Sequence, residues 1–208
     1  MGLIRGNPSV SRYRLLEAPD ALTDEYVRDR LQRNAFVDIE ATSEESSLGW
    51  VEIMDQLAVN FDPGAFQFGG FLAFTARLDS RRISPRTLSR YYRLRELEFE
   101  AQAGRKPNSQ KKKEIKDSLR QELLRRSLLN TDLLEVLWFP KEHEIWLGGA
   151  GEKKRLLFEE LWERTFGLAV RLLVPITLGL EMVPAELGPK LLKARAIGLL
   201  GGDEDEDE

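Results

Sequence analysis

The segment 84–129 limits most strongly how this chain can fold, because its pattern is helical over most of its length and contains one break. Apolar residues recur at steps of three and four over residues 88–101, which is the period of an amphipathic helix. Ser84 is a favourable N-cap, and the proline that follows it is favoured in a first helical turn. Gly104 and Pro107 make an uninterrupted helix unfavourable. We therefore expect two helices joined by a short loop.

The second half of this segment predicts a helix that pairs with the first. Ile115, Leu119 and Leu123 recur every four residues and form a narrow apolar seam. Such a seam is suited to an antiparallel helical hairpin, with residues 105–113 at its far tip. We refer to residues 84–129 as the arm.

The charge of the chain is segregated, although its formal net charge is only −4. Residues 203–208 are all acidic, whereas residues 105–126 carry nine basic and three acidic side chains. A strip of lysine and arginine on a projecting hairpin suits phosphate backbones, and such binding is salt-dependent and independent of base sequence. The alternative is a charged helix face that is only solvated. The predicted DNA contacts are Arg105, Lys106, Lys111, Lys112, Lys113, Lys116 and Arg120.

Short strands and packing helices are predicted on both sides of the arm. The predicted strands are 11–17, 36–39, 49–53, one or two strands within 66–78, 133–139, 143–147 and one or two within 170–183. In the first of them Tyr13 and Leu15 lie on one face, and the strands 133–139 and 143–147 are expected to form a β-hairpin. The predicted helices are 20–34, with Thr23 as a candidate N-cap, 152–166, with Gly167 as its C-cap, and, more weakly, 187–200. This order predicts an α+β fold, with helices packed on a mostly antiparallel sheet and a projecting basic helical hairpin. We expect residues 1–185 to form one domain and residues 186–208 to hold the terminal helix and a disordered acidic tail.

The phenylalanines at 66, 68, 71 and 74 have two possible roles. They are expected to belong to the core, and the alternative is a platform on which bases stack.

No pattern in the sequence predicts a catalytic site, a metal site or a cofactor. His143 is the single histidine and has no nucleophile pattern beside it. The glycine-rich residues 148–151 precede a helix but lack the Lys-Ser/Thr pair of a phosphate-binding loop, so a turn is expected. The chain has no cysteine, and no apolar run is long enough to span a membrane. We expect a non-catalytic cytoplasmic protein without cofactors.

Several stretches together resemble the RdgC family of recombination-associated proteins. The most specific are Gly49-Trp50-Val51 and the lysine-rich run from Lys112 to Asp117. Tyr13-Arg14-Leu15, Ile83-Ser84-Pro85 and the two apolar runs around residues 136–139 and 145–147 continue the likeness. It covers residues 12–183.

The resemblance implies a bacterial nucleoid protein that binds single- and double-stranded DNA without sequence preference. Family members form ring-shaped dimers around DNA and restrain recombinase filaments. They continue well beyond the point where this chain turns into its acidic run. The resemblance therefore leaves open whether DNA is encircled, and it implies a homodimer as a possible assembly.

Two other classes of function stay open at the level of sequence. A protein-interaction module would use the basic arm against an acidic partner, or the acidic tail as a mimic of DNA. A nuclease would need a set of metal ligands that the sequence does not show.

Overall fold

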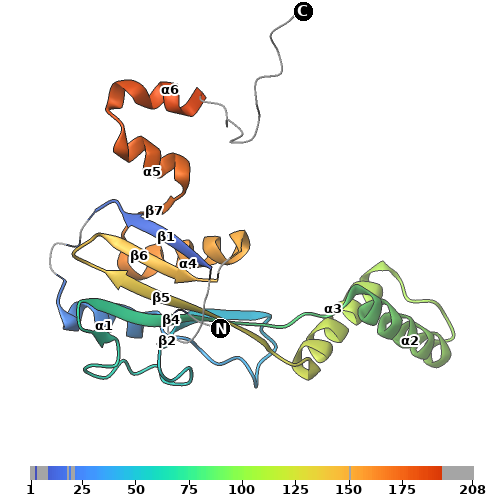
Figure 1. The fold of residues 1–208 in the computed structure, drawn as a ribbon. Helices are drawn as coiled ribbons and strands as arrows, with labels where there is room; N and C mark the ends of the chain where they lie inside the picture. Colours follow the sequence, from blue (N-terminus) through green and yellow to red (C-terminus); the bar gives the residue numbers. More distant parts are fainter. Residues whose placement is uncertain (1–2, 4–8, 18, 20–21, 150, 194–208) are drawn as a thin grey trace, which may run out of the picture.

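The fold is seen in a computed structural model that describes residues 3, 9–17, 19, 22–149 and 151–193 (Figure 1). The predicted acidic tail and the second half of the predicted terminal helix lie outside these residues. The strands are β1 (Val10–Leu15), β2 (Ser46–Glu52), β3 (Gln67–Phe68), β4 (Phe71–Ser80), β5 (Asn130–Phe139), β6 (Glu144–Gly148) and β7 (Val170–Leu173). The helices are α1 (Asp24–Arg33), α2 (Pro85–Ala103), α3 (Ser109–Arg126), α4 (Glu152–Phe166), α5 (Pro175–Met182) and α6 (Gly188–Lys193), with a 3₁₀ turn at Ala185–Leu187.

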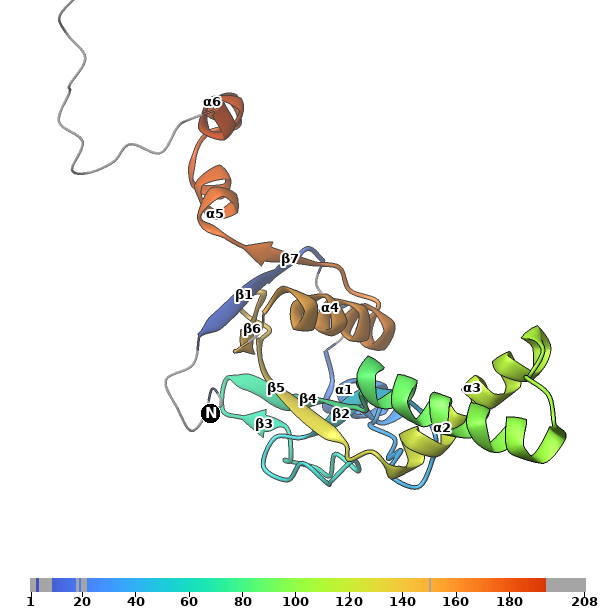
Figure 2. The same ribbon diagram turned by 90° about the vertical axis from the view of Figure 1, so that its right-hand side faces the viewer.

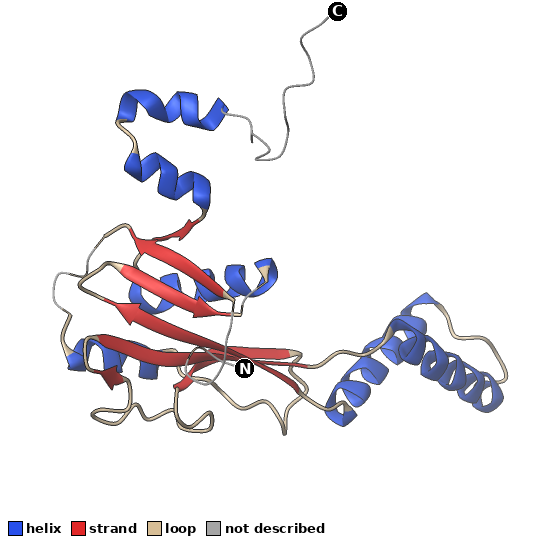
Figure 3. Ribbon diagram, in the orientation of Figure 1, coloured by secondary structure: helices blue, strands red, loops and turns tan. Residues whose placement is uncertain are grey.

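The described strands form one open sheet with antiparallel pairing throughout (Figure 3). Their order is β2-β4-β5-β6-β1-β7, and the short β3 pairs only with β4. Helices cover one face of this sheet, so the predicted α+β class with a mostly antiparallel sheet is confirmed.

Helices α1 and α4 build the core on one face of the sheet. Tyr13 and Leu15 alternate inward along β1, as predicted, and both are buried. Across from them α4 buries Phe158, Trp162 and Phe166, which lie in the same apolar cluster as the inward residues of α1. Full burial of one such side chain contributes roughly 1.5–3 kcal/mol. This aromatic layer fixes the sheet from which the arm leaves.

A buried hydrogen bond joins α4 to the edge strand β2. The indole Nε1 of Trp50 donates to Oγ1 of Thr165 at 2.7 Å, and that hydroxyl donates to the carbonyl oxygen of Leu161 at 2.7 Å. Trp50 and Thr165 are both inaccessible to solvent. The contact satisfies the indole N–H, which would otherwise be buried without a partner.

Local sequence patterns predicted most of the helices and strands correctly. Thr23 caps α1 by accepting a hydrogen bond from the Tyr26 amide at 3.1 Å, as predicted. Gly167 ends α4 in the left-handed conformation. The segment 66–78 forms two strands that meet at Gly69 and Gly70, and β5 pairs with β6 as the predicted hairpin.

The predicted strand at 36–39 is wrong. A single parallel bridge between Ala35 and Trp50 is all the pairing there, and Phe36 and Ile39 are the two buried residues. Their spacing of three does not fit the period of two that a strand requires. The side chain of Asp38 instead accepts a hydrogen bond from the Glu40 amide at 2.8 Å, which turns the chain.

The interpretation of residues 170–183 is correct only for its first part. Val170–Leu173 forms β7, but Pro175 begins helix α5 and does not interrupt a strand. Proline is favoured at this first helical position because its missing N–H has no intrahelical partner there. The predicted terminal helix is present over Gly188–Lys193.

The four phenylalanines divide between the two faces of the sheet. Phe66 and Phe74 belong to the core, as predicted. Phe68 and Phe71 are half-buried and stack on each other with ring centroids 6.0 Å apart.

Gly49 allows the chain after α1 to lie directly against β2. A Cβ atom at this position would come within 2.5 Å of Phe36 Cα and 2.7 Å of the Ala35 carbonyl carbon. These are backbone atoms that cannot rotate away.

We predict that Gly49→Ala lowers the free energy of unfolding by about 2 kcal/mol or more, because the added methyl group overpacks this contact. Gly70→Ala is the matched control, since nothing lies within 4 Å of the position that its methyl group would take. The control is expected to change stability by less than about 0.5 kcal/mol. Urea unfolding followed by tryptophan fluorescence measures both, and equal effects of the two substitutions would contradict the packing argument.

Candidate nucleic-acid interface

The arm is inserted between two neighbouring strands. It leaves the sheet after β4 and returns at the start of β5, and Ser80 and Asn130 at these two points are paired in register. Figure 1 shows α2 and α3 beyond this end of β4 and β5, away from α1 and α4, and Figure 2 shows the same two helices from the side of the arm. The two ends of the arm are therefore held together by strand pairing.

The first helix of the arm has the ends predicted from the sequence, and the second begins at a cap that was not predicted. Ser84 Oγ accepts from the Thr87 amide at 3.1 Å at the start of α2, and Gly104 ends that helix in the left-handed conformation. Asn108 Oδ1 accepts from the Lys111 amide at 2.8 Å and caps α3. These caps fix the break between the helices at residues 104–108.

Few apolar contacts hold the two helices together. Helix α2 buries none of its residues, whereas α3 buries Leu119 and Leu124. Of the predicted seam, Leu119 is thus buried, and Ile115 and Leu123 are half-buried.

Ion pairs connect α2 to α3 across the solvent-exposed surface. Arg95 bonds to Glu122 at 3.0 Å, and Lys112 lies 3.7 Å from Glu96. Exposed pairs of this kind contribute little to stability, because water and salt screen the two charges.

The base of α3 is tied to the sheet through the loop before β2. Arg120 contacts the Glu45 carboxylate at 2.6 Å. That loop is held in turn by the buried Arg81, whose guanidinium donates to the carbonyl oxygens of Glu40 and Thr42, both at 2.6 Å. The base of the arm is therefore better fixed than its tip.

All seven predicted contact residues are solvent-exposed, but the structure separates them into three groups. Lys112, Lys113 and Lys116 line one groove between α2 and α3. Arg105, Lys106 and Lys111 line a second hollow at the tip. Arg120 lines neither of them; it lies one helical turn after Lys116 on α3 and contacts Glu45 in the loop before β2.

The seven side chains also differ in whether a carboxylate already neutralises them. Lys111 pairs with Glu114 at 3.0 Å, Lys112 pairs with Glu96, and Arg120 pairs with Glu45. Within the described part of the chain, no ion pair involves the other four, which are Arg105, Lys106, Lys113 and Lys116. These four are the cations most available to a phosphate.

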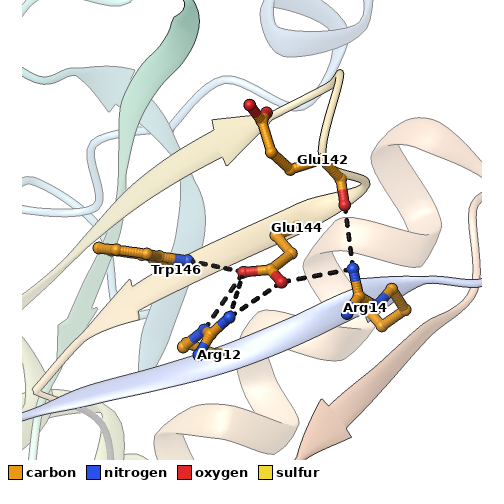
Figure 4. A network of polar contacts seen from close by, with 5 residues as sticks. All are labelled: Arg12, Arg14, Glu142, Glu144 and Trp146. Carbon is orange, nitrogen blue, oxygen red and sulfur yellow. Dashed lines mark hydrogen bonds and ion pairs between the residues drawn. The ribbon is translucent and has the colours of Figure 1, made fainter. Parts of the chain in front are cut away.

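A cluster that the sequence analysis missed lies on the sheet face opposite α1 and α4 (Figure 4). Glu144 on β6 contacts Arg12 at 2.7 Å and Arg14 at 3.3 Å, and it accepts from Trp146 Nε1 at 3.1 Å. Arg14 also donates to the carbonyl oxygen of Glu142 at 3.0 Å. The alternating pairs Arg-x-Arg and Glu-x-Trp on facing strands are the sequence signal that could have located it.

The surroundings of Glu144 keep it ionised. Burial raises the pKa of its carboxyl group, but hydrogen bonds from Arg12 and Trp146 and the charges of both arginines outweigh burial, so the pKa lies below its ordinary value. A carboxylate that contacts two arginines and an indole N–H stabilises the structure and is poorly suited to act as a general base. The cluster links β1 to β6 and neutralises part of the positive charge on this face.

The other candidates for chemistry have structural explanations. His143 is exposed in the turn between β5 and β6 and adopts a positive φ of 53°. Among the described residues, no group of three or more His, Cys, Asp or Glu side chains is placed to hold a metal ion. No helix in that part of the chain is both long and apolar enough to cross a membrane.

The fold and the arm define an α+β protein whose insertion between β4 and β5 carries clustered lysines on a helical surface. The family model described as "Putative exonuclease, RdgC" matches residues 9–175, a range that includes the arm and every strand from β1 to β7. The chain belongs to the RdgC family, and at the level of the family this is a group of recombination-associated nucleoid proteins. No protein of curated function matches the sequence.

We predict that Glu144→Gln destabilises the protein at neutral pH and that the loss shrinks in acid. The pKa of Glu144 is lowered in the folded state. The ionised carboxylate therefore contributes stability above the unfolded pKa of about 4.3, and this stability is lost as the pH falls through the folded pKa. Urea midpoints of parent and variant, measured from about pH 6 to about pH 3, follow the difference.

Glu142→Gln is the matched control for this prediction, because its side chain is exposed and only its backbone carbonyl contacts Arg14. It is expected to follow the parent at every pH. A gap between parent and Glu144→Gln that does not change with pH would show that the charge of Glu144 is not what stabilises the cluster.

Proposed function

We propose that this protein binds DNA without sequence preference and does so through the arm. The supporting observation is the arrangement at the start of α3. Lys113 and Lys116 are exposed, have no ionic partner among the described residues, and lie beside Lys112 in one groove. Clustered cations of this kind contact phosphates without reading bases.

The position of these lysines in the helix supports the same proposal. The first turn of α3 contains no acidic residue, and three consecutive lysines follow its start at Ser109. A cation near a helix N-terminus is unfavourable, because that end carries the positive part of the helix dipole; each such charge is worth about 0.3–1 kcal/mol. The three lysines therefore destabilise the start of α3, and a contribution to folding stability does not explain why they are there. A phosphate near this end would be attracted by both the lysines and the dipole.

Family membership adds the biological setting to the proposal. As a member of a recombination-associated family, the protein would act by occupying DNA in the nucleoid and so modulating recombination. Single- and double-stranded DNA can both be bound through contacts that involve only phosphates. A homodimer is part of the proposal through the family alone, and the mass of the protein in solution tests it.

We predict that reversing Lys113 and Lys116 together to glutamate weakens DNA binding at least about tenfold and reduces the slope of log affinity against log salt by about 2, because about one counterion is released for each phosphate contacted. Fluorescence anisotropy with a labelled duplex and a labelled single strand, over a series of salt concentrations, measures both quantities. Parent affinity is expected to be micromolar or weaker at moderate salt and similar for unrelated sequences.

The matched control reverses Lys141 and Lys153, which are also exposed but lie on the β5–β6 turn and on α4. This control changes the net charge by the same amount and is expected to leave most of the affinity and slope intact. Arg120→Glu should also have a smaller effect than the double reversal, because Glu45 already neutralises Arg120. Equal loss in both double variants would contradict a site on the arm.

The proposal includes no catalytic step, in contrast to the exonuclease in the description of the family model. Hydrolysis assisted by metal ions relies on carboxylates gathered around the metal. We predict that end-labelled single- and double-stranded DNA stays intact when incubated with the full chain and Mg²⁺ or Mn²⁺. Shortening of the strand from its end, abolished by EDTA, would overturn this part of the proposal.

A further inference from the structure

Helices α2 and α3 leave a groove of about 630 Å³ that combines apolar and cationic walls. Helix α2 contributes Leu88 and Tyr92, with Pro85 at its start, and α3 contributes Lys112, Lys113 and Lys116. Leu88 and Tyr92 are half-buried, whereas the three lysines are exposed. The groove thus has an apolar wall facing a row of positive charges.

The hollow on the other side of the same helix pair has a different character. It has a volume of about 500 Å³, and its walls carry both signs of charge. Arg95 and Glu122 bond across it, and Lys111 pairs with Glu114. These charges are satisfied within the arm.

The positive charges of the first groove are not neutralised within the arm in the same way. No carboxylate lines it, and of its three lysines only Lys112 pairs with an acidic residue in the described part of the chain, at 3.7 Å. An occupant that satisfies both walls needs apolar side chains next to negative charges. A sugar-phosphate backbone supplies the charges but has no aliphatic side chain for Leu88 and Tyr92 to contact.

The chain itself contains a segment with this chemistry. Residues 197–200 include Ile197, Leu199 and Leu200, and after two glycines residues 203–208 are all acidic. Only two glycines therefore separate the apolar residues from a run of six carboxylates, in a stretch that follows α6. We propose that residues 197–208 bind in the α2–α3 groove, with the leucines against Leu88 and Tyr92 and the carboxylates at Lys112, Lys113 and Lys116.

Binding of this segment would have a consequence that rests on the proposed function. Lys113 and Lys116 would serve both DNA and the acidic segment, so the two ligands would exclude each other. The segment would then lower the affinity for DNA, and more so at low salt, where interactions between exposed charges are least screened.

The test uses the full chain with the six acidic residues 203–208 changed to their amides, which removes the charges through which its own segment would compete with an added peptide. A labelled synthetic peptide of residues 197–208 is added, and fluorescence anisotropy measures binding at low salt. We expect saturable binding that Lys113→Glu with Lys116→Glu weakens at least about tenfold, since attraction becomes repulsion. The Lys141→Glu with Lys153→Glu control is expected to bind the peptide as the parent does.

A second pair of measurements separates the groove from general attraction between opposite charges. Tyr92→Ala in the protein, or Leu199→Ser with Leu200→Ser in the peptide, is expected to weaken binding several-fold because the apolar contact is lost. Circular dichroism shows whether the Tyr92→Ala variant keeps its helices, and the serine peptide needs no such control. Equal binding of the parent and serine peptides, or equal binding to the parent and the lysine-reversed protein, would overturn the proposal.

DNA binding measured on the same proteins keeps the two proposals distinguishable. Tighter DNA binding by the amide variant than by the parent, reversed by added peptide, supports exclusion. DNA binding without peptide binding would overturn the inference alone. Peptide binding without DNA binding would overturn the proposed function and leave the groove assigned to the acidic segment.

Discussion

The packing of α4 against the sheet is the interaction on which the rest of the structure depends. Trp162 contacts Trp138 with ring centroids 5.0 Å apart, and Phe166 lies 5.2 Å from the same ring. Trp138 is part of β5, the strand that receives the end of the arm. The aromatic layer therefore fixes the strands β4 and β5, and their pairing fixes the two ends of the arm.

This division of roles explains why the arm can present so many charges. The core supplies the stability of the domain, so α2 does not need to bury any of its residues. Strand pairing and the contact between Arg120 and Glu45 hold the base. Lysines at the start of α3 can then stay exposed, although the helix dipole disfavours them. The exposed surface of the arm does not have to stabilise the fold, so it is available for binding. This availability is the physical basis of the proposed function.

Much of the fold could be predicted from the sequence because its signals are local. The caps at Thr23, Ser84 and Gly167 and the alternation along β1 depend only on neighbouring residues. The strand predicted at 36–39 failed because the chain pairs with β2 only at the bridge between Ala35 and Trp50 and then turns at Asp38. This pairing is a tertiary effect that local propensity does not contain.

The sequence predicted that the candidate site is basic, but it did not predict which of the basic side chains are free of carboxylate partners. A run of basic residues is visible in the sequence, yet the carboxylates that neutralise Lys112 and Arg120 come from Glu96 and Glu45, which are distant in the chain. The apolar wall beside the lysines likewise depends on how α2 crosses α3. Only the folded arm shows which cations remain available.

Hydrogen exchange followed by mass spectrometry, with and without DNA, tests most directly the claim that the arm is the binding surface. We expect slower exchange in the first turns of α3 and the α2–α3 loop, over residues 105–116, and no change in the β5–β6 turn. Slower exchange confined to the strands of the sheet, with the arm unchanged, would contradict it.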